Sequence, residues 1–85
     1  MAFLWIIWDD ENDPLGNVQH IAEHGLTTGE VEAVLNDPHS ADSSDSSGLP
    51  CVFGFTPASE HIIVIFEAID EDSIYPVTAY HVPEP

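Results

Sequence analysis

The order of segments along the chain predicts an α+β fold, in which two helices pack on one face of a mostly antiparallel sheet. Three observations carry this prediction. One apolar segment opens the chain, two segments with helical periodicity follow, and three strand-like segments close it. The predicted order is β-α-α-β-β-β, in a single domain over residues 1–85.

The first strand is expected over residues 3–8, which are all apolar and rich in β-branched and aromatic side chains. An acidic turn over 9–13 ends it. The first helix then begins with Asp13 as its N-cap and Pro14 as its first residue, and Gly25 supplies the left-handed position after its end. Its apolar face is expected to hold four residues: Leu15, Val18, Ile21 and Ala22.

The second helix follows immediately. Thr27 and Glu30 have the spacing of a capping box, and the sequence over 36–38, Asn-Asp-Pro, stops the helix. Residues 39–50 are dominated by serine and aspartate and are expected to form a mobile acidic loop.

Three further strands are expected over residues 51–55, 61–67 and 74–81, joined by short hairpin loops. Pro76 has no N–H to donate to a neighbouring strand. The last strand therefore needs either a sheet edge or a bulge at this position.

The composition narrows the possible functions sharply. The chain has no lysine and no arginine against 16 acidic residues, and its formal net charge is −16. It therefore lacks an arginine clamp for phosphate and a lysine nucleophile. This charge repels nucleic acid and anionic membrane surfaces and favours cationic partners, with weak association of divalent cations. No nucleic acid, membrane or cofactor is expected to bind.

The remaining general features are consistent with a cytoplasmic protein. Cys51 is the only cysteine, so no intrachain disulfide forms, and a buried, inert thiol is expected there. The apolar segment over 3–8 is too short to span a membrane and lacks the basic flank of a signal peptide.

Several short motifs, taken in order, resemble the BrnT family of bacterial type II toxins. Trp8-Asp9 matches the end of that family's first strand. Residues 20–25, His-Ile-Ala-Glu-His-Gly, match the close of its first helix, and residues 29–38 match its second helix through Asp-Pro. Residues 77–80, Val-Thr-Ala-Tyr, match its last strand. The resemblance implies a RelE-like ribonuclease fold and an antitoxin-like protein partner.

The chain departs from this family where the family is basic. Glu23 stands where the pattern has lysine, and Tyr80 stands where it has arginine. RelE-like ribonucleases use basic residues to hold RNA and to stabilise charge at the scissile phosphate. The resemblance therefore supports the fold more than the activity. No catalytic residue is assigned, and His24 is the one candidate considered.

Two other patterns could carry chemistry. His20 and His24 lie one helical turn apart and could hold Zn²⁺ or Cu²⁺, with Glu23 or Asp9 as a third ligand; the alternative is that His24 closes the helix and His20 is a surface residue. The acidic residues over 9–13 and 70–72 lack the ligand pattern of an EF-hand and are expected to form solvated turns.

Three functional hypotheses remain. The first is a non-catalytic BrnT-like scaffold, engineered to lack lysine and arginine, without ribonuclease activity. The second is a natural, acidic BrnT-like binding protein of a toxin–antitoxin type system. The third is an active ribonuclease toxin, with His24 paired to His61 or His81 as acid and base. The absence of both basic residues favours the first over the second. Formation of a homodimer through an exposed strand is a further expectation.

Overall fold

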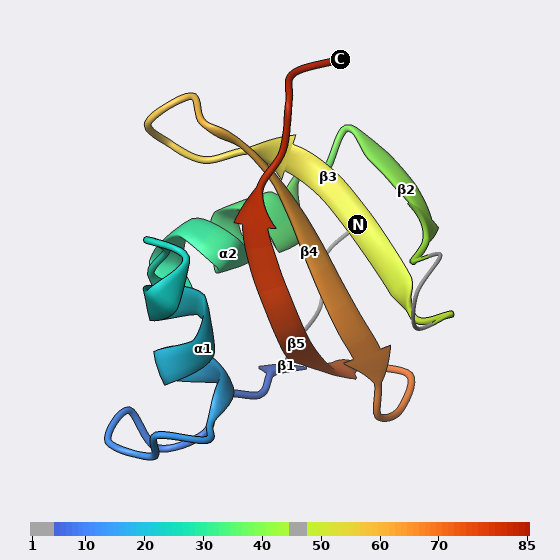
Figure 1. Ribbon diagram of the computed structural model, residues 1–85. Helices are drawn as coiled ribbons and strands as arrows, with labels where there is room; N and C mark the ends of the chain where they lie inside the picture. The colour runs from blue at the N-terminus through green and yellow to red at the C-terminus, as the bar shows by residue number, and fades with distance from the viewer. Residues whose placement is uncertain (1–4, 45–47) are drawn as a thin grey trace.

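The computed structural model describes residues 5–44 and 48–85, which form a five-stranded sheet and two helices (Figure 1). The sheet order is β1-β5-β4-β3-β2; β1 runs parallel to β5, and the other neighbours are antiparallel. This confirms the α+β fold. The elements are β1 (Trp5–Ile6), α1 (Asn17–Glu23), α2 (Thr28–Asn36), β2 (Ser40–Ser43), β3 (Pro50–Phe55), β4 (His61–Ala68) and β5 (Ser73–His81).

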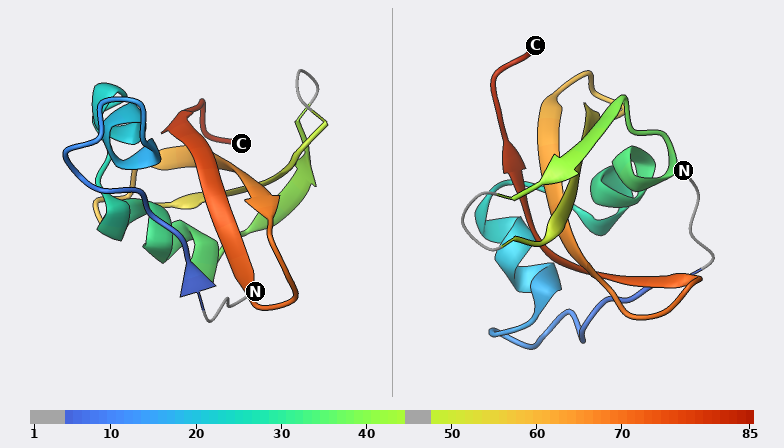
Figure 2. Two further views of the ribbon diagram at one scale, coloured as in Figure 1. Left: turned by 90° about the horizontal axis from the view of Figure 1, so that it is seen from below. Right: turned by 90° about the vertical axis from the view of Figure 1, so that its right-hand side faces the viewer.

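Both helices pack on the same face of the sheet. Figures 1 and 2 show α1 beside β5, and α2 across β3 and β4. Ile21, Val34 and Leu35 of the helices bury their side chains against Val64 and Ala79 of the sheet, as part of the main core. A second, smaller cluster lies on the opposite face, which neither α1 nor α2 covers. It contains Cys51, Ile63 and Ile65, with Leu49, Phe53 and Val82 packed around them.

The predicted start of the first helix is wrong. The N-cap is Gly16 rather than Asp13, and Pro14 lies in the preceding turn. The Asp13 carboxylate accepts a hydrogen bond from the backbone N–H of Leu15 at 2.9 Å and so closes a turn instead of capping the helix. A Cβ atom on Gly16 would lie 2.7 Å from the Cβ of Asp9, so only glycine permits the chain to pass there.

The predicted apolar face of this helix is wrong at both ends. Leu15 lies outside the helix and is 94% exposed, and Ala22 is also exposed. Ile21 is buried in the main core as expected, and Val18 is half-buried. The end of the helix is confirmed: Gly25 has φ +78°, and the N–H of Leu26 bonds to the carbonyl of Ile21.

The second helix confirms its predicted signals. Thr27 is the N-cap, its hydroxyl accepts from the Glu30 N–H at 3.2 Å, and the Glu30 carboxylate accepts from the Thr27 N–H at 3.0 Å. The helix ends at Asn36, directly before Asp37 and Pro38.

The region expected to be a mobile loop contains an additional strand. Ser40–Ser43 forms β2, which pairs with β3 from Ser40 opposite Phe53 to Ser43 opposite Pro50. All four of its side chains are exposed, so it lacks the apolar alternation that identifies a strand in a sequence. It is a strand because it supplies hydrogen bonds to the edge of β3.

The strand at the start of the chain is shorter than expected, whereas the last strand follows the prediction. β1 includes only Trp5 and Ile6, while Phe3 and Leu4 lie outside the described residues. In β5, the register with β4 shifts between Ile65 and Phe66, so that Phe66 lies opposite Pro76. The sequence predicts that Pro76 needs either a sheet edge or a bulge, and this irregularity meets the second condition.

Candidate functional site

The residues that sequence analysis selected around the first helix do lie together. His20 and His24 are in edge-on ring contact, with centroids 5.2 Å apart, and His20 Nδ1 lies 3.9 Å from the Glu23 carboxylate. The Tyr80 ring lies 6.0 Å from that of His24. Positions 23 and 80, which hold lysine and arginine in the BrnT pattern, therefore both lie beside this helix end, and neither supplies a positive charge.

This arrangement limits what His24 can do chemically. Its Nδ1 lies 2.9 Å from the backbone carbonyl of Ala79, which can only accept a hydrogen bond, so Nδ1 carries the proton. In the neutral ring, Nε2 then holds the lone pair. His24 could thus act as a single base. The two histidines proposed as its partners make other contacts: His61 contacts His39, and His81 Nε2 lies 3.6 Å from the Glu60 carboxylate.

Three of the ligands proposed for the predicted metal site, His20, His24 and Glu23, lie beside one another. Across residues 5–44 and 48–85, no group of three or more His, Cys, Asp or Glu side chains is arranged to hold a metal ion. Asp9, proposed as a third ligand, instead accepts hydrogen bonds from Asn17 and Tyr75. Binding of a metal by His20 and His24 stays a prediction.

The sheet brings together a histidine pair that the sequence analysis missed. His39 precedes β2 and His61 begins β4, and their Nε2 atoms lie 2.8 Å apart. His61 Nδ1 donates to the carbonyl of Pro83 at 2.8 Å, so His61 Nε2 accepts the proton of His39 when His61 is neutral. The ring of Phe55 lies against both imidazoles. Part of this cluster was readable in the sequence, because a five-residue hairpin loop places Phe55 opposite His61.

A polar network joins the start of α1 to the sheet. Asn17 is 2% exposed; its amide donates to the carbonyls of Ile7 at 3.1 Å and Pro76 at 2.9 Å, and its Oδ1 accepts from the N–H of Asp9 at 2.9 Å. The Asp9 carboxylate accepts from the Asn17 N–H at 3.0 Å and from the Tyr75 hydroxyl at 2.5 Å. This network accounts structurally for the aspartate of the Trp-Asp motif.

The same network changes two pKa values. The hydrogen bond from Tyr75, followed by that from the Asn17 N–H, holds the pKa of Asp9 below its ordinary value of 3.8. The bond to Asp9 also raises the pKa of Tyr75 from 10.0 to about 12, with smaller contributions from partial burial and from the neighbouring carboxylates. Both pKa shifts favour an ionised Asp9 and a protonated Tyr75. Neither group is therefore set to exchange a proton near neutral pH, and the network has a structural role.

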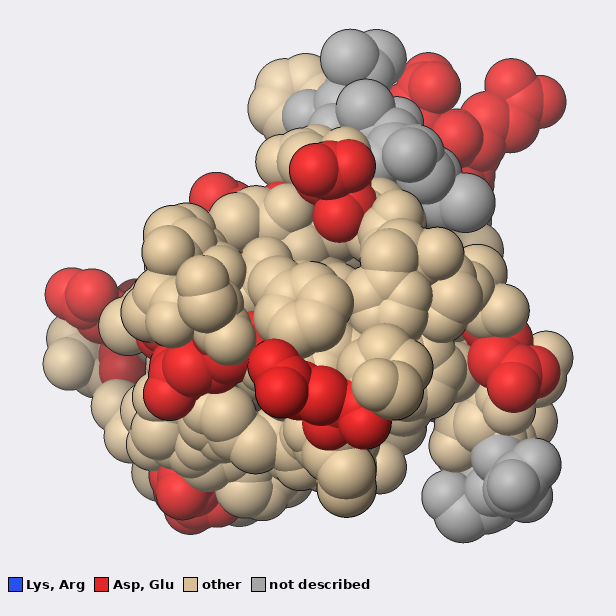
Figure 3. Space-filling model, turned by 90° about the horizontal axis from the view of Figure 1, so that it is seen from above, with Lys and Arg blue, Asp and Glu red and all other residues tan. Residues whose placement is uncertain are grey.

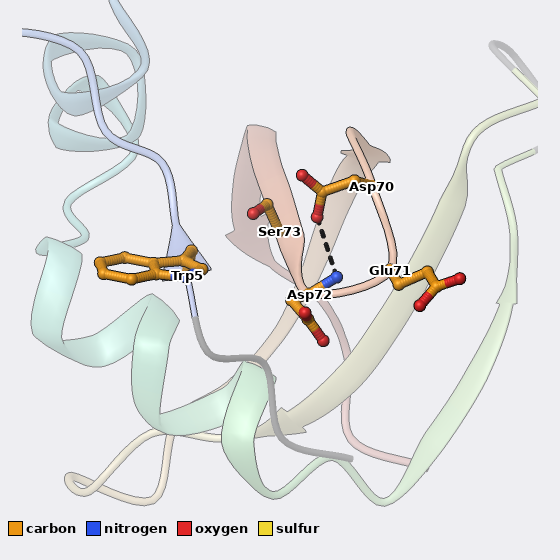
Figure 4. A pocket seen from close by; sticks show the side chains of 5 residues that line it. All are labelled: Trp5, Asp70, Glu71, Asp72 and Ser73. Atoms are coloured by element: carbon orange, nitrogen blue, oxygen red, sulfur yellow. Dashed lines mark hydrogen bonds between the residues drawn. The ribbon is translucent and has the colours of Figure 1, made fainter.

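Carboxylates in the acidic turns accept hydrogen bonds from backbone N–H groups of the same turn. Asp70 accepts from the N–H of Asp72 at 2.9 Å, and this bond lowers the pKa of Asp70. These residues and Glu71 line a hollow of about 460 Å³ beside Trp5, which is 66% exposed. Figure 4 shows the three carboxylates pointing in different directions, so they do not converge on one cation position. The expectation of solvated turns is consistent with this geometry.

A different hollow, of about 280 Å³, lies on the face of the sheet that the helices leave uncovered. Cys51, Phe53 and Ile63 contribute apolar surface. Tyr80, which is 38% exposed, and Asp42 of β2 complete the main walls. The remaining lining residues are Ser43 and Ser44. No sequence pattern predicted this hollow, because one of its walls is the unpredicted strand β2.

The surface as a whole is negative. Figure 3 shows acidic side chains spread over the face in view, and the chain contains no lysine or arginine on any face. Within the described part of the chain, neither helix is long and apolar enough to cross a membrane. No family model, curated protein or solved structure matches this chain.

Proposed function

We propose that this chain is a non-catalytic protein of BrnT-like architecture that binds a cationic region of another protein. The observation that carries the proposal is the charge: sixteen carboxyl side chains share one small surface with no permanent cation. A field of one sign raises the local concentration of partners of the opposite sign and steers their approach.

The geometry around His24 supports a role without catalysis. Its Nδ1 is held by the Ala79 carbonyl, and the neighbouring positions 23 and 80 carry Glu and Tyr. A phosphodiester cleaved here would develop negative charge beside carboxylates, where a ribonuclease provides cations. The negative surface also opposes the approach of RNA.

The uncovered face of the sheet supports a role in protein binding. It exposes the aromatic side chains of Phe55 and Tyr80, and Asp42 lines the same hollow as Tyr80. Aromatic residues with a charged rim are typical of protein interfaces.

A binding experiment with two opposed probes tests the proposal. We expect a fluorescent oligolysine peptide to bind at about 0.15 M salt and to weaken as salt is raised, because exposed charges are increasingly screened. An oligoglutamate peptide of equal length is the matched control and should not bind. Single-stranded RNA should neither bind nor be cleaved.

Two results would contradict the proposal. One is the absence of oligolysine binding even at low salt. The other is RNA cleavage that disappears in the His24→Ala variant, which would make His24 a catalytic residue and support the ribonuclease hypothesis instead.

A further inference from the structure

We propose that the hollow between β2 and β5 on the uncovered sheet face receives an arginine side chain of the cationic partner. This inference rests on the proposed function and assigns it a position and a side-chain type. The hollow is assembled from four strands: Asp42 of β2 lies opposite Cys51 of β3, and Phe53 of β3 lies opposite Ile63 of β4, which in turn lies opposite Tyr80 of β5.

The register explains why these side chains meet. Residues directly opposite each other in antiparallel strands project to the same face, so this set surrounds one depression. The main core, with both helices, occupies the other face. The depression is therefore not filled by α1 or α2.

The walls of the hollow match the two parts of an arginine side chain. Phe53 and Ile63 offer apolar surface to its three-carbon stem, while the partly exposed ring of Tyr80 offers a face on which a planar guanidinium can stack. At about 280 Å³, the hollow is smaller than the pockets that hold drug-sized ligands, and it suits one long side chain.

The carboxylate at the rim supplies the charge that such a side chain needs. Asp42 is exposed, and its Oδ1 accepts from the N–H of Ser43 at 2.8 Å, which fixes its orientation at the end of β2. A carboxylate pairs with guanidinium in a planar, two-point geometry that an ammonium group cannot reproduce. No lysine or arginine of this chain can compete for it, since the sequence contains neither.

A matched pair of peptides tests the side-chain type. Each is a short lysine-containing peptide with one central residue flanked by apolar residues; in one peptide that residue is arginine, and in the other it is citrulline, which has nearly the same shape and no charge. We expect the arginine peptide to bind about tenfold more tightly, as for the loss of one charge-assisted hydrogen-bonded contact. Equal affinities would overturn the assignment of arginine.

Two variants that each remove one negative charge test whether the hollow is the binding position. Asp42→Asn should weaken binding of the arginine peptide about tenfold, whereas Asp10→Asn, which removes an exposed carboxylate elsewhere, should weaken it less than about twofold. Tyr80→Leu should also weaken binding, and the exposed Leu15→Ala is its control. Amide chemical shifts report both the fold of each variant and the residues that the peptide perturbs.

The outcomes separate this inference from the proposed function. If the Asp42→Asn and Asp10→Asn variants lose affinity equally while oligolysine still binds, the hollow is not the site and the proposed function stands. If neither peptide nor oligolysine binds at low salt, both fail. Shifts confined to Phe53, Ile63 and Tyr80 on addition of the arginine peptide would support the inference directly.

Discussion

Helices α1 and α2 are neighbours in the chain, yet their first turns are fixed by contacts at different sequence separations. The start of α2 is held by Thr27 and Glu30, three residues apart. The start of α1 is held by Asp9, eight residues before Asn17, and the Asn17 side chain reaches the carbonyl of Pro76, 59 residues away. One helix is specified locally, whereas the other is specified by the assembled sheet.

This difference predicts which helix depends on the tertiary structure. A local capping box can form in an isolated segment and adds a modest free energy. The contacts of Asn17 form only when α1, the segment that follows β1, and β5 are all in place, so they depend on the tertiary structure. Substitutions in the two first turns can therefore measure how far the two helices differ.

The largest effect is expected for Asn17→Ala. The buried amide satisfies the carbonyls of Ile7 and Pro76 and the N–H of Asp9, and alanine leaves all three without this partner. We expect the free energy of unfolding to fall by about 3 kcal/mol, measured by urea denaturation. Asn36→Ala, at the exposed end of α2, is the control and should change it by less than about 0.5 kcal/mol. Equal losses in the two variants would remove the distinction between the helices.

A smaller, pH-dependent effect is expected for Tyr75→Phe. This variant loses the hydrogen bond that the Tyr75 hydroxyl donates to Asp9 but keeps the one that the Asn17 N–H donates. The pKa of Asp9 is lowered by folding, so the stability it contributes is present above 3.8 and is lost as pH falls through its folded pKa. The pKa of Tyr75 is raised by folding, so its contribution is present below 10 and is lost as pH rises toward about 12.

The advantage of the wild type over Tyr75→Phe should therefore form a plateau from about pH 5 to pH 9 and decline on both sides. Chemical denaturation of both proteins across this range measures it. The absorbance of ionised tyrosine can be measured in the same samples. The difference in this absorbance between the wild type and Tyr75→Phe should appear only as pH approaches 12. A difference in stability that is independent of pH would show that Tyr75 acts through packing alone.

The smallest effect is expected for Thr27→Ala, which removes the hydroxyl of the capping box. The loss should be about 1 kcal/mol and appear as a modest fall in Tm. Thr27→Ser keeps the hydroxyl and should restore most of the loss. If Thr27→Ala destabilises the protein more than Asn17→Ala does, the local contact is the stronger of the two.

The contrast between contacts at short and at long sequence separation also explains how much of the fold could be predicted from the sequence. The capping box of α2, the left-handed Gly25 and the irregularity at Pro76 were all predictable, because each follows from residues within a few positions. The start of α1 was not predictable, since Asp13-Pro14 fits a helix start locally, whereas in the structure Asp9, eight residues before Asn17, accepts from the Asn17 N–H. β2 was not predictable either, because its polar sequence becomes a strand through pairing with β3.

The candidate sites divide in a similar way. His20 and His24 were predictable as neighbours from helical spacing, and the structure places their rings in contact. The pairing of His39 with His61, and the hollow at Asp42, depend on β2 and so required the complete sheet. Contacts within one helix follow from residue spacing, whereas contacts assembled from several strands depend on the tertiary structure.

The bonds from α1 to β5 also affect how the molecule behaves toward other copies of itself. Among residues 5–44 and 48–85, no strand pairs with the outer side of β5 beyond Ile74, and an unpaired strand edge can accept a strand from another chain. The side chains of Asn17 and His24 already occupy the carbonyls of Pro76 and Ala79 there. An incoming chain must displace both before it can pair. The contacts that position α1 thus also act as a barrier against aggregation.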